Sequence, residues 1–350
     1  MNQQTFYPVT EKSQVGEARR RIGEVAEQSG FDQTAGERVA IVVTELATNL
    51  LKHGEEGELV VRTLPTATYT GLEILALDRG PGMANVAECL RDGYSTTGSL
   101  GQGLGAIQRL STHFDLYSAP GLGTALRVEL WARPPAPAAA MRFVHGAISR
   151  PKPGEAICGD GWTLHAHDTG CTLLVCDGLG HGPDAAAATH QALRTFLAQP
   201  TRPPTVQVEA IHTALRTTRG AAVAIAAIAA DSPSGDMTNS EPAADGVEFV
   251  GLGNISGRVI TDEAARHLLS QNGIAGHQAR KIQGFPQRWA KDALLILHSD
   301  GLGTRWNIDS YPGLRQRHPS LIAGVLYRDF TRGNDDVTVV VVKEVGVVGS

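Results

Sequence analysis

Two hydrophobic periods alternate along the chain, and each change of period marks a predicted element. Residues 37–53 place apolar side chains every three to four positions, which predicts an amphipathic helix that ends before Gly54. At 100° per residue, Glu45 and Asn49 fall together on the polar arc of this helix. Asn is a mediocre helix former and neither residue is at a cap, so the pair favours a functional role over a merely solvated face.

A strand and two glycine-rich turns follow this helix. Residues 71–77, GLEILAL, form an apolar run typical of a buried strand, which ends at Asp78 in a DxGxG sequence. Residues 98–105, GSLGQGLG, then lead into a second helical pattern. A glycine-rich loop that opens a helix brings backbone N–H groups to an anion. The three motifs in this order therefore predict an anion-binding site in the first part of the chain.

The second part of the chain repeats one motif at the ends of two apolar runs. DGLG follows the run TLLVC and later the run LLIL, with its carboxylates at Asp177 and Asp300. Asp160 in CGDG and Asp335 in NDDVT also adjoin strand-like segments. Carboxylates gathered without a partner would repel one another, and hard cations such as Mg²⁺ or Mn²⁺ resolve that conflict. These four positions therefore predict a metal site.

Composition and charge exclude several classes of protein. The chain has 350 residues, a net charge of −5 and 42% hydrophobic residues, so no broad basic surface predicts nucleic-acid binding. Its start, MNQQTFYPVTEK, has no signal-like segment, and its longest apolar run is too short to span a membrane. Four cysteines without CxxC spacing are typical of reduced thiols, so we expect a cytoplasmic protein without a membrane or nucleic-acid partner.

A proline-rich stretch divides the chain into two domains. Residues 133–140, RPPAPAAA, hold three prolines without alternation, which is typical of a semi-rigid linker. The expected organisation is a first domain at 1–133, a linker at 134–140 and a second domain at 141–350. Strand-like and helical segments occur in both parts, so the predicted fold class is α+β.

The first domain resembles the GHKL family of ATP-binding domains, and within it the small serine kinases of the RsbT and RsbW type. The resemblance implies a sandwich of a mixed sheet and helices. It also implies that Glu45 is the general base on a protein hydroxyl and that Asn49 holds Mg²⁺ on the ATP phosphates. Asp78 would accept the adenine amino group. The remaining residues implied for ATP binding are Gly80, Gly82, Gly101, Gly103, Gly105 and Thr124.

The second domain resembles the metal-dependent PPM phosphatases, in the SpoIIE and RsbX branch. The resemblance implies an α-β-β-α sandwich and two metals bridged by Asp177, with Asp160 and the Gly178 carbonyl on one side. Asp300 and Asp335 would hold the other side, and a bridging water would attack a phosphoserine or phosphothreonine. Many relatives carry Asn in the place of Asp336, so Asp336 is left out of the expected ligand set.

Together the two resemblances predict a bifunctional regulator. It would use ATP to phosphorylate a STAS-domain antagonist protein and would use Mg²⁺ or Mn²⁺ to dephosphorylate a STAS-type partner. Two alternatives remain open at this point. The first domain could sequester a sigma factor or another regulator, or it could serve the phosphatase as a nucleotide sensor. The retained Glu45 counts against the sensor, which does not need a base.

Overall fold

The chain folds into two compact units that interleave in sequence. The computed structural model describes residues 4–66, 68–90, 103–133, 142–167, 170–229, 246–279 and 281–345. One unit comprises Met1–Ala139 with Asn307–Arg328, and the other comprises Ala140–Trp306 with Asp329–Ser350. The predicted linker 134–140 and Gly101 lie outside the described residues.

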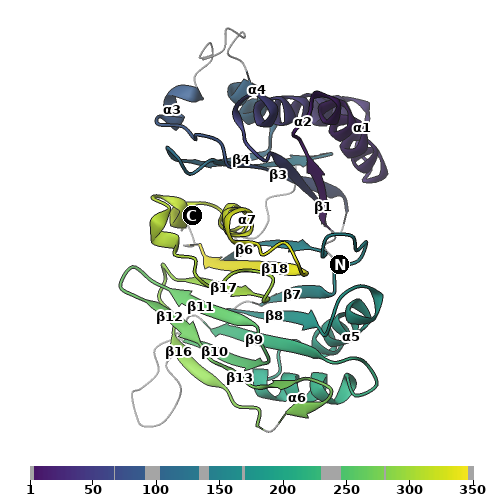
Figure 1. The fold of residues 1–350 in the computed structure, drawn as a ribbon, viewed down its shortest axis with the longest axis vertical. Coiled ribbons are helices and arrows are strands. Elements are labelled where there is room, and N and C mark those ends of the chain that lie inside the picture. Colours follow the sequence, from purple (N-terminus) through teal and green to yellow (C-terminus); the bar gives the residue numbers. More distant parts are fainter. Residues whose placement is uncertain are drawn as a thin grey trace. The chain divides into compact units, whose positions relative to one another are not determined.

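The first unit is built on one antiparallel sheet with helices on one face (Figure 1). The strand order is β1-β2-β3-β5-β4, and the helices α1, α2 and α4 pack on this face around a core of aliphatic side chains. The strands are β1 (Gln4–Pro8), β2 (Glu58–Pro65), β3 (Thr70–Asp78), β4 (His113–Ser118) and β5 (Thr124–Trp131). The helices are α1 (Lys12–Gln28), α2 (Gln33–His53), α3 (Val86–Cys89) and α4 (Gly103–Leu110).

Helix α2 begins earlier than its hydrophobic pattern predicts. Asp32 caps it, because its carboxylate accepts a hydrogen bond of 2.8 Å from the Ala35 N–H. The helix ends at His53, where the Gly54 N–H closes the last turn on the Leu50 carbonyl. The predicted strand at 71–77 is β3, and its even-numbered residues Leu72, Ile74 and Ala76 face the helices.

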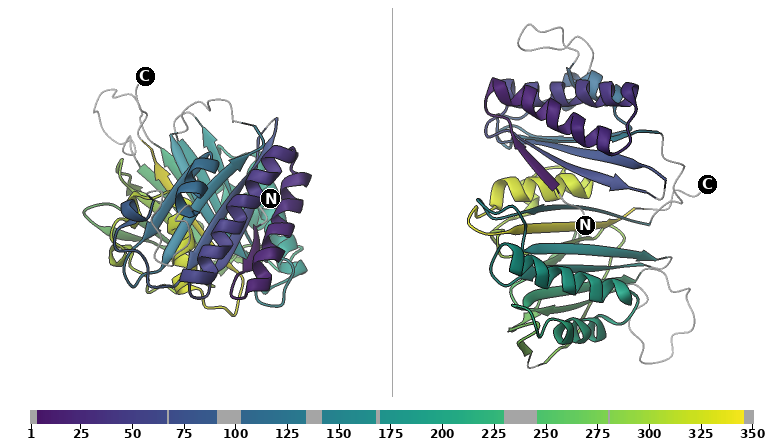
Figure 2. Two further views of the ribbon diagram at one scale, coloured as in Figure 1. Left: turned by 90° about the horizontal axis from the view of Figure 1, so that it is seen from above. Right: turned by 90° about the vertical axis from the view of Figure 1, so that its right-hand side faces the viewer.

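The opposite face of this sheet is also buried. The odd-numbered residues of β3 point there, and Leu75 and Leu77 are each 1% exposed. Helix α7 (Pro319–Phe330) covers this face, preceded by the 3₁₀ turns η1 (Ile308–Ser310) and η2 (Leu314–Gln316). A Cβ on Gly324 of α7 would lie 3.0 Å from Leu77. Figure 2 shows α7 below the sheet and α1 and α2 above it.

The second unit contains two sheets that share a core. The larger sheet has the order β13-β10-β9-β8-β7, with β16 paired to β10, and the other has the order β12-β11-β17-β18-β6. Aliphatic side chains from both sheets, such as Val175 and Leu295, belong to one buried cluster. Helices α5 (Pro183–Ala198) and α6 (Pro204–Ala214) cover the larger sheet with a second cluster. The arrangement is a β-sandwich with an outer helical layer.

The strands of the second unit fix where its loops meet. They are β6 (Phe143–Arg150), β7 (Asp160–His167), β8 (Gly170–Gly178), β9 (Ala221–Ala229), β10 (Gly246–Leu252), β11 (Ser256–Ile260), β12 (Ala265–Leu268), β13 (Ser270–Gln271), β14 (Gly273–Ile274), β15 (Gln278–Ala279), β16 (Phe285–Arg288), β17 (Leu294–His298) and β18 (Val337–Glu344). β14 and β15 form a small hairpin of their own. Within the described parts of the chain, no helix combines the length and apolarity needed to cross a membrane.

Candidate active sites

The polar arc of α2 meets the start of α4 in the first unit. A Cβ on Gly103, the first residue of α4, would lie 3.1 Å from the Glu45 Oε2 atom and 3.7 Å from the Asn49 Oδ1 atom. The glycine therefore lets the helix start approach both side chains. The Asn49 Nδ2 atom is buried, and it has no hydrogen-bond partner among the described residues. A buried amide without a partner is costly, so Asn49 is suited to bind a ligand that the chain alone does not supply.

Asp78 lies at the end of β3 beside two required glycines. Its Oδ1 atom accepts a hydrogen bond of 2.8 Å from the Gly80 N–H. A Cβ on Gly80 would lie 2.4 Å from the His53 carbonyl oxygen, and Gly82 adopts a φ of +70°. Burial raises the pKa of Asp78, although the Gly80 N–H opposes this. Thr124 of β5 stands directly opposite Asp78 in the strand register.

These two groups of residues belong to one region of the first unit. Helix α2 carries Glu45 and Asn49 and ends at His53, whose carbonyl abuts Gly80. Gly54, the next residue, approaches the Asp78 side chain so closely that a Cβ would lie 2.8 Å from its Cβ atom. The structure thus brings Gly103 to Glu45 and Asn49, and it brings Gly80 and Thr124 to Asp78, while Gly105 is buried in α4.

The predicted metal carboxylates of the second unit come from four strand ends. Asp160 begins β7, and Asp177 stands directly opposite it near the end of β8. The Asp160 Oδ2 atom accepts a hydrogen bond of 2.6 Å from the hydroxyl of Ser299, the residue before Asp300. The Ser299 hydroxyl oxygen in turn accepts the Thr338 N–H at 2.9 Å, two residues after Asp336.

Close backbone contacts hold the same loops together. A Cβ on Gly301, after Asp300, would lie 2.0 Å from the Asp336 carbonyl oxygen. A Cβ on Gly178, after Asp177, would lie 2.2 Å from the Ala185 carbonyl oxygen. Gly178 and Gly301, the first glycine of each DGLG motif, are therefore needed for the loops to pack. This requirement is a reason for the motif to occur twice.

Two of the gathered carboxylates, Asp160 and Asp177, have strongly raised pKa values. Burial raises the pKa of Asp177 to about 7, with added repulsion from Asp300, Asp335 and Asp336. Burial also raises the pKa of Asp160 well above its ordinary value, and the charge of Asp177 adds to this. The two groups stand directly opposite each other, so one proton shared between them would relieve part of the repulsion.

This donor set fits hard divalent cations. All its side-chain ligands are carboxylates, the type that Mg²⁺ and Mn²⁺ prefer, and bound cations would remove their mutual repulsion. Two of the nearby carboxylates also bind protein donors. Asp300 accepts a hydrogen bond from the Asn254 amide at 2.8 Å, and Asp336 accepts one from the Lys152 N–H at 2.8 Å. As they stand, no three His, Cys, Asp or Glu side chains of the described residues are grouped as ligands of one metal ion.

Sequence reasoning missed several residues of this site. Asp336 is 3% exposed, and its Oδ2 atom is buried without a hydrogen-bond partner among the residues described. Ser299 links Asp160 to the Asp300 loop, and Asn254 binds Asp300. Asp336 stands beside Asp335 in the sequence and was left out of the expected ligand set, and Ser299 stands beside Asp300. Asn254 left no signal, because it is distant in sequence from Asp300.

The histidines of β7 and of the loop after Asp177 have contacts of their own. His181, after the first DGLG, binds the Glu155 carboxylate at 2.6 Å on the surface. The rings of His165 and His167 pack against each other at 6.2 Å on β7. An exposed ion pair of 2.7 Å joins Arg219 to Asp184 near the same loop.

Comparisons with known proteins match both units. Residues 9–130 match the family described as histidine kinase-like ATPase domain, and residues 167–344 match the family of stage II sporulation protein E, SpoIIE. Over 133 residues the chain is 32% identical to the serine/threonine-protein kinase RsbT of Bacillus subtilis (strain 168), an alignment that covers 38% of this chain and 100% of RsbT.

Solved structures show related folds. A chain from the bacterial stressosome, described as a modular system adapted to control secondary messenger signaling, aligns with a TM-score of 0.51 and 23% identity over 57% of this chain and 99% of its own. RsbX in complex with magnesium aligns with a TM-score of 0.48 and 20% identity over 58% of this chain and 96% of its own. The family matches and the RsbT alignment confirm the predicted α+β fold class and both resemblances.

Proposed function

Because the chain belongs to the SpoIIE phosphatase family and carries a kinase domain of the RsbT family, we propose that it adds phosphate to and removes phosphate from a small STAS-domain protein. The chain is a partner-switching regulator with a serine/threonine phosphatase domain and a kinase domain. The finer proposal concerns its substrate, its metals and the residues that act. Its action in the cytoplasm stays a prediction.

In the proposed kinase reaction, Glu45 accepts the proton of a substrate serine or threonine hydroxyl. The hydroxyl oxygen bonds to the γ-phosphorus of ATP, and the bond to the β-phosphate oxygen breaks to release ADP. Asn49 would hold Mg²⁺, which neutralises charge on the phosphates when bound. Asp78 would accept the adenine amino group, and the glycines near Gly103 would let backbone N–H groups approach the phosphates.

One observation carries the kinase proposal. Gly103 lies against both Glu45 and Asn49, so the start of the phosphate-binding helix meets the proposed base and the proposed metal ligand. Phosphoryl transfer depends on placing these groups together more than on covalent chemistry. A nucleotide sensor would need Asn49 and Asp78 but not a carboxylate at this point.

In the proposed phosphatase reaction, Asp177 would be the central carboxylate that holds divalent cations. Asp160 and the Gly178 carbonyl would complete one side, and Asp300 and Asp335 the other. Bound cations would lower the pKa of a water molecule and so supply a hydroxide at neutral pH. Overall, the oxygen of water would bond to phosphorus as the bond to the serine oxygen breaks. One proton of that water would pass to the serine oxygen, and phosphate would be released. The observation that supports this is the convergence of carboxylates whose pKa values burial and mutual repulsion raise.

The proposal is tested by following phosphate on candidate STAS proteins. The full chain is incubated with γ-labelled ATP and each STAS protein, with and without Mn²⁺. We expect phosphorylated STAS protein to accumulate with the Asp177→Asn chain. We expect the Glu45→Ala chain to dephosphorylate a STAS protein that was phosphorylated beforehand. Tethered domains act at high effective concentration on a partner that one of them holds, so both steps should be efficient.

Other outcomes distinguish the alternatives. A sigma factor retained by the chain without any phosphate transfer would favour a sequestering module. A phosphatase that ignores every protein labelled by the kinase would refute a shared substrate. In that case the two domains must act on different targets.

A further inference from the structure

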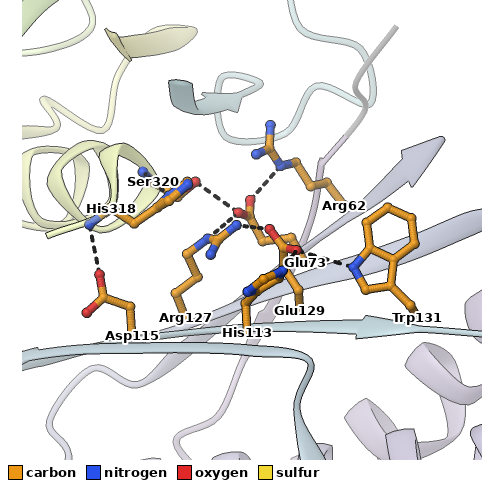
Figure 3. Close-up of polar contacts among 9 residues, drawn as sticks. All are labelled: Arg62, Glu73, His113, Asp115, Arg127, Glu129, Trp131, His318 and Ser320. Carbon is orange, nitrogen blue, oxygen red and sulfur yellow. Dashed lines mark hydrogen bonds and ion pairs between the residues drawn. The ribbon is translucent and has the colours of Figure 1, made fainter. Parts of the chain in front are cut away.

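Residues 307–328 belong to the first unit, although they follow most of the second unit in sequence. The segment lies on the face of the kinase sheet opposite α1 and α2. Hydrogen bonds from its own side chains and backbone hold it there (Figure 3). The Ser320 hydroxyl donates to Glu73 at 2.9 Å, and the His318 N–H donates to Asp115 at 2.8 Å. The Tyr327 hydroxyl donates to Glu58 at 3.0 Å. These anchors reach strands β2, β3 and β4.

The sheet face beneath the segment is built to be covered. Glu73 is 1% exposed and lies between two guanidinium groups, with Arg62 Nε at 2.5 Å and Arg127 Nε at 2.6 Å. Burial alone would raise the pKa of Glu73, but Arg62 and Arg127 hold it well below its ordinary range. A buried charge cluster needs every member to be paired. Ser320 supplies a further hydrogen bond to it from outside the sheet.

Arg328 ends the segment at the rim of the proposed nucleotide site. It is 7% exposed, and its Nη1 atom donates to the Asp78 carbonyl oxygen at 2.6 Å and to the Thr124 carbonyl oxygen at 3.3 Å. Its Nη2 atom donates to the Leu122 carbonyl oxygen at 2.8 Å. One side chain therefore ties the end of β3 to the turn before β5. Asp78 and Thr124 are two of the residues proposed to bind adenine.

The turn is shaped to admit this guanidinium. Gly123 has a φ of +67°, and a Cβ there would lie 2.8 Å from the Arg328 Nη1 atom and 2.1 Å from the Asp78 carbonyl oxygen. The positive charge of Arg328 also opposes the effect of burial on Asp78 and favours its ionised, accepting form. The backbone carbonyl of Arg328 accepts a hydrogen bond from Arg79. Both the backbone and the guanidinium group of Arg328 are therefore held by hydrogen bonds.

We propose that Arg328 is a positioning residue of the nucleotide site, supplied to the kinase unit from beyond residue 306. It fixes the backbone of Asp78 and Thr124, and so places the Asp78 carboxylate that reads the adenine amino group. The inference rests on the proposed ATP binding. It adds that a chain limited to the predicted kinase domain lacks a part of the site. Arginine suits this task because its planar fork reaches three carbonyls that the single ammonium of lysine cannot reach together.

The test measures which part of the nucleotide is lost. Binding of ATP, GTP and inorganic tripolyphosphate to the full chain is measured by calorimetry for the wild type and for Arg328→Lys. Tyr327→Phe is the matched control, because it removes an anchor of the same helix that bonds to Glu58 of β2 and not to the carbonyl groups of Asp78, Thr124 and Leu122. We expect Arg328→Lys to weaken ATP about tenfold or more and to erode the preference for ATP over GTP, with tripolyphosphate unchanged. Tyr327→Phe should leave all three affinities unchanged.

Each contrary result has a distinct meaning. Unchanged ATP affinity in Arg328→Lys would overturn the inference, and so would an equal loss of ATP and tripolyphosphate, which indicates general loosening. Arg328→Gln, which keeps hydrogen-bond donors without the charge, provides a second variant if the lysine chain does not fold. A wild-type chain that binds no ATP would overturn the proposed kinase function, and this inference with it.

Discussion

Asp160 and Asp177 face each other as a directly paired couple on the antiparallel strands β7 and β8. Side chains so placed lie on the same face of a sheet, and like charges directly opposite are destabilising. Burial raises the pKa of both groups, and the charge of Asp177 is the next contribution at Asp160. The unit thus contains an electrostatic conflict that folding alone does not resolve. Cation binding would resolve it, which gives the site its predicted metal dependence.

Replacing Asp177 by Asn should separate activity from stability. We expect phosphatase activity to fall by about 100-fold or more, because the bridging ligand is lost. In chelator at pH 8, the free energy of unfolding should rise by roughly 1–3 kcal/mol, because a buried repelling charge is removed. Phosphate release and urea unfolding measure the two effects. Asp184→Asn, an exposed carboxylate on α5, should change neither.

Metal removal should weaken the wild-type fold as well as its activity. Chelator should stop dephosphorylation, and added Mn²⁺ or Mg²⁺ should restore it. Because only the folded chain gathers the carboxylates, a cation at 100 times its dissociation constant should stabilise by about 2.7 kcal/mol. Thermal unfolding with and without metal measures this, and Asp177→Asn should show a smaller shift. Full activity in chelator would contradict the two-metal site.

Replacing Glu45 should stop phosphate transfer while sparing nucleotide binding. A general base contributes about 10²–10⁴-fold to the rate but is not a main ligand of ATP. Asn49→Ala should lose both binding and transfer, since the metal ligand is removed. Labelled-phosphate transfer and ATP calorimetry measure the two quantities. Glu37→Ala, at an exposed position of the same helix, is the control, and wild-type transfer by Glu45→Ala would show that another group is the base.

The buried Glu73 cluster should give a stability difference that depends on pH. Glu73→Gln should cost about 3–5 kcal/mol at pH 7, because two buried guanidinium groups lose their counter-charge. The folded pKa of Glu73 is depressed, so its contribution is present above the unfolded value of about 4.3 and is lost as pH falls below it. The difference from wild type should therefore shrink below about pH 4. Urea unfolding from pH 3 to 7 measures it, with exposed Glu27→Gln as the control.

A fragment of residues 1–133 should self-associate. Without α7 its sheet would expose side chains that are now buried, among them Val60, Leu75, Leu77 and Tyr117. A contiguous apolar patch of this kind drives association. Light scattering after gel filtration measures the fragment against the same fragment fused to residues 307–330. A monomeric, stable fragment would show that the kinase sheet does not need α7.

The sequence predicted the elements that carry local signals. The hydrophobic period predicted α2, the apolar run predicted β3, and the DGLG motifs predicted the strand ends at Asp177 and Asp300. Each of these signals lies within one helix or at one strand end. The apolar run of β3 indicated a buried strand, but it did not indicate what covers the second face. The partners of Glu73 and Leu77 lie in a helix far along the chain.

The sequence predicted the site less completely than the fold, for the same reason. Asp336 was set aside on the basis of a family pattern, yet it is buried beside the other carboxylates. Arg328 stands in a segment with no motif, and only its hydrogen bonds to the carbonyl groups of Asp78 and Leu122 reveal its position. Contacts between residues so distant in sequence leave no spacing that can be read in a single chain.

The late position of α7 has a consequence for synthesis on the ribosome. All five strands of the kinase sheet have been made once Trp131 has emerged, but the helix that covers their second face begins only at Pro319. At about 5–20 residues per second, that face waits on the order of ten to forty seconds for its cover. During this time the nascent chain carries an open apolar surface, so its early half is the natural client for a chaperone.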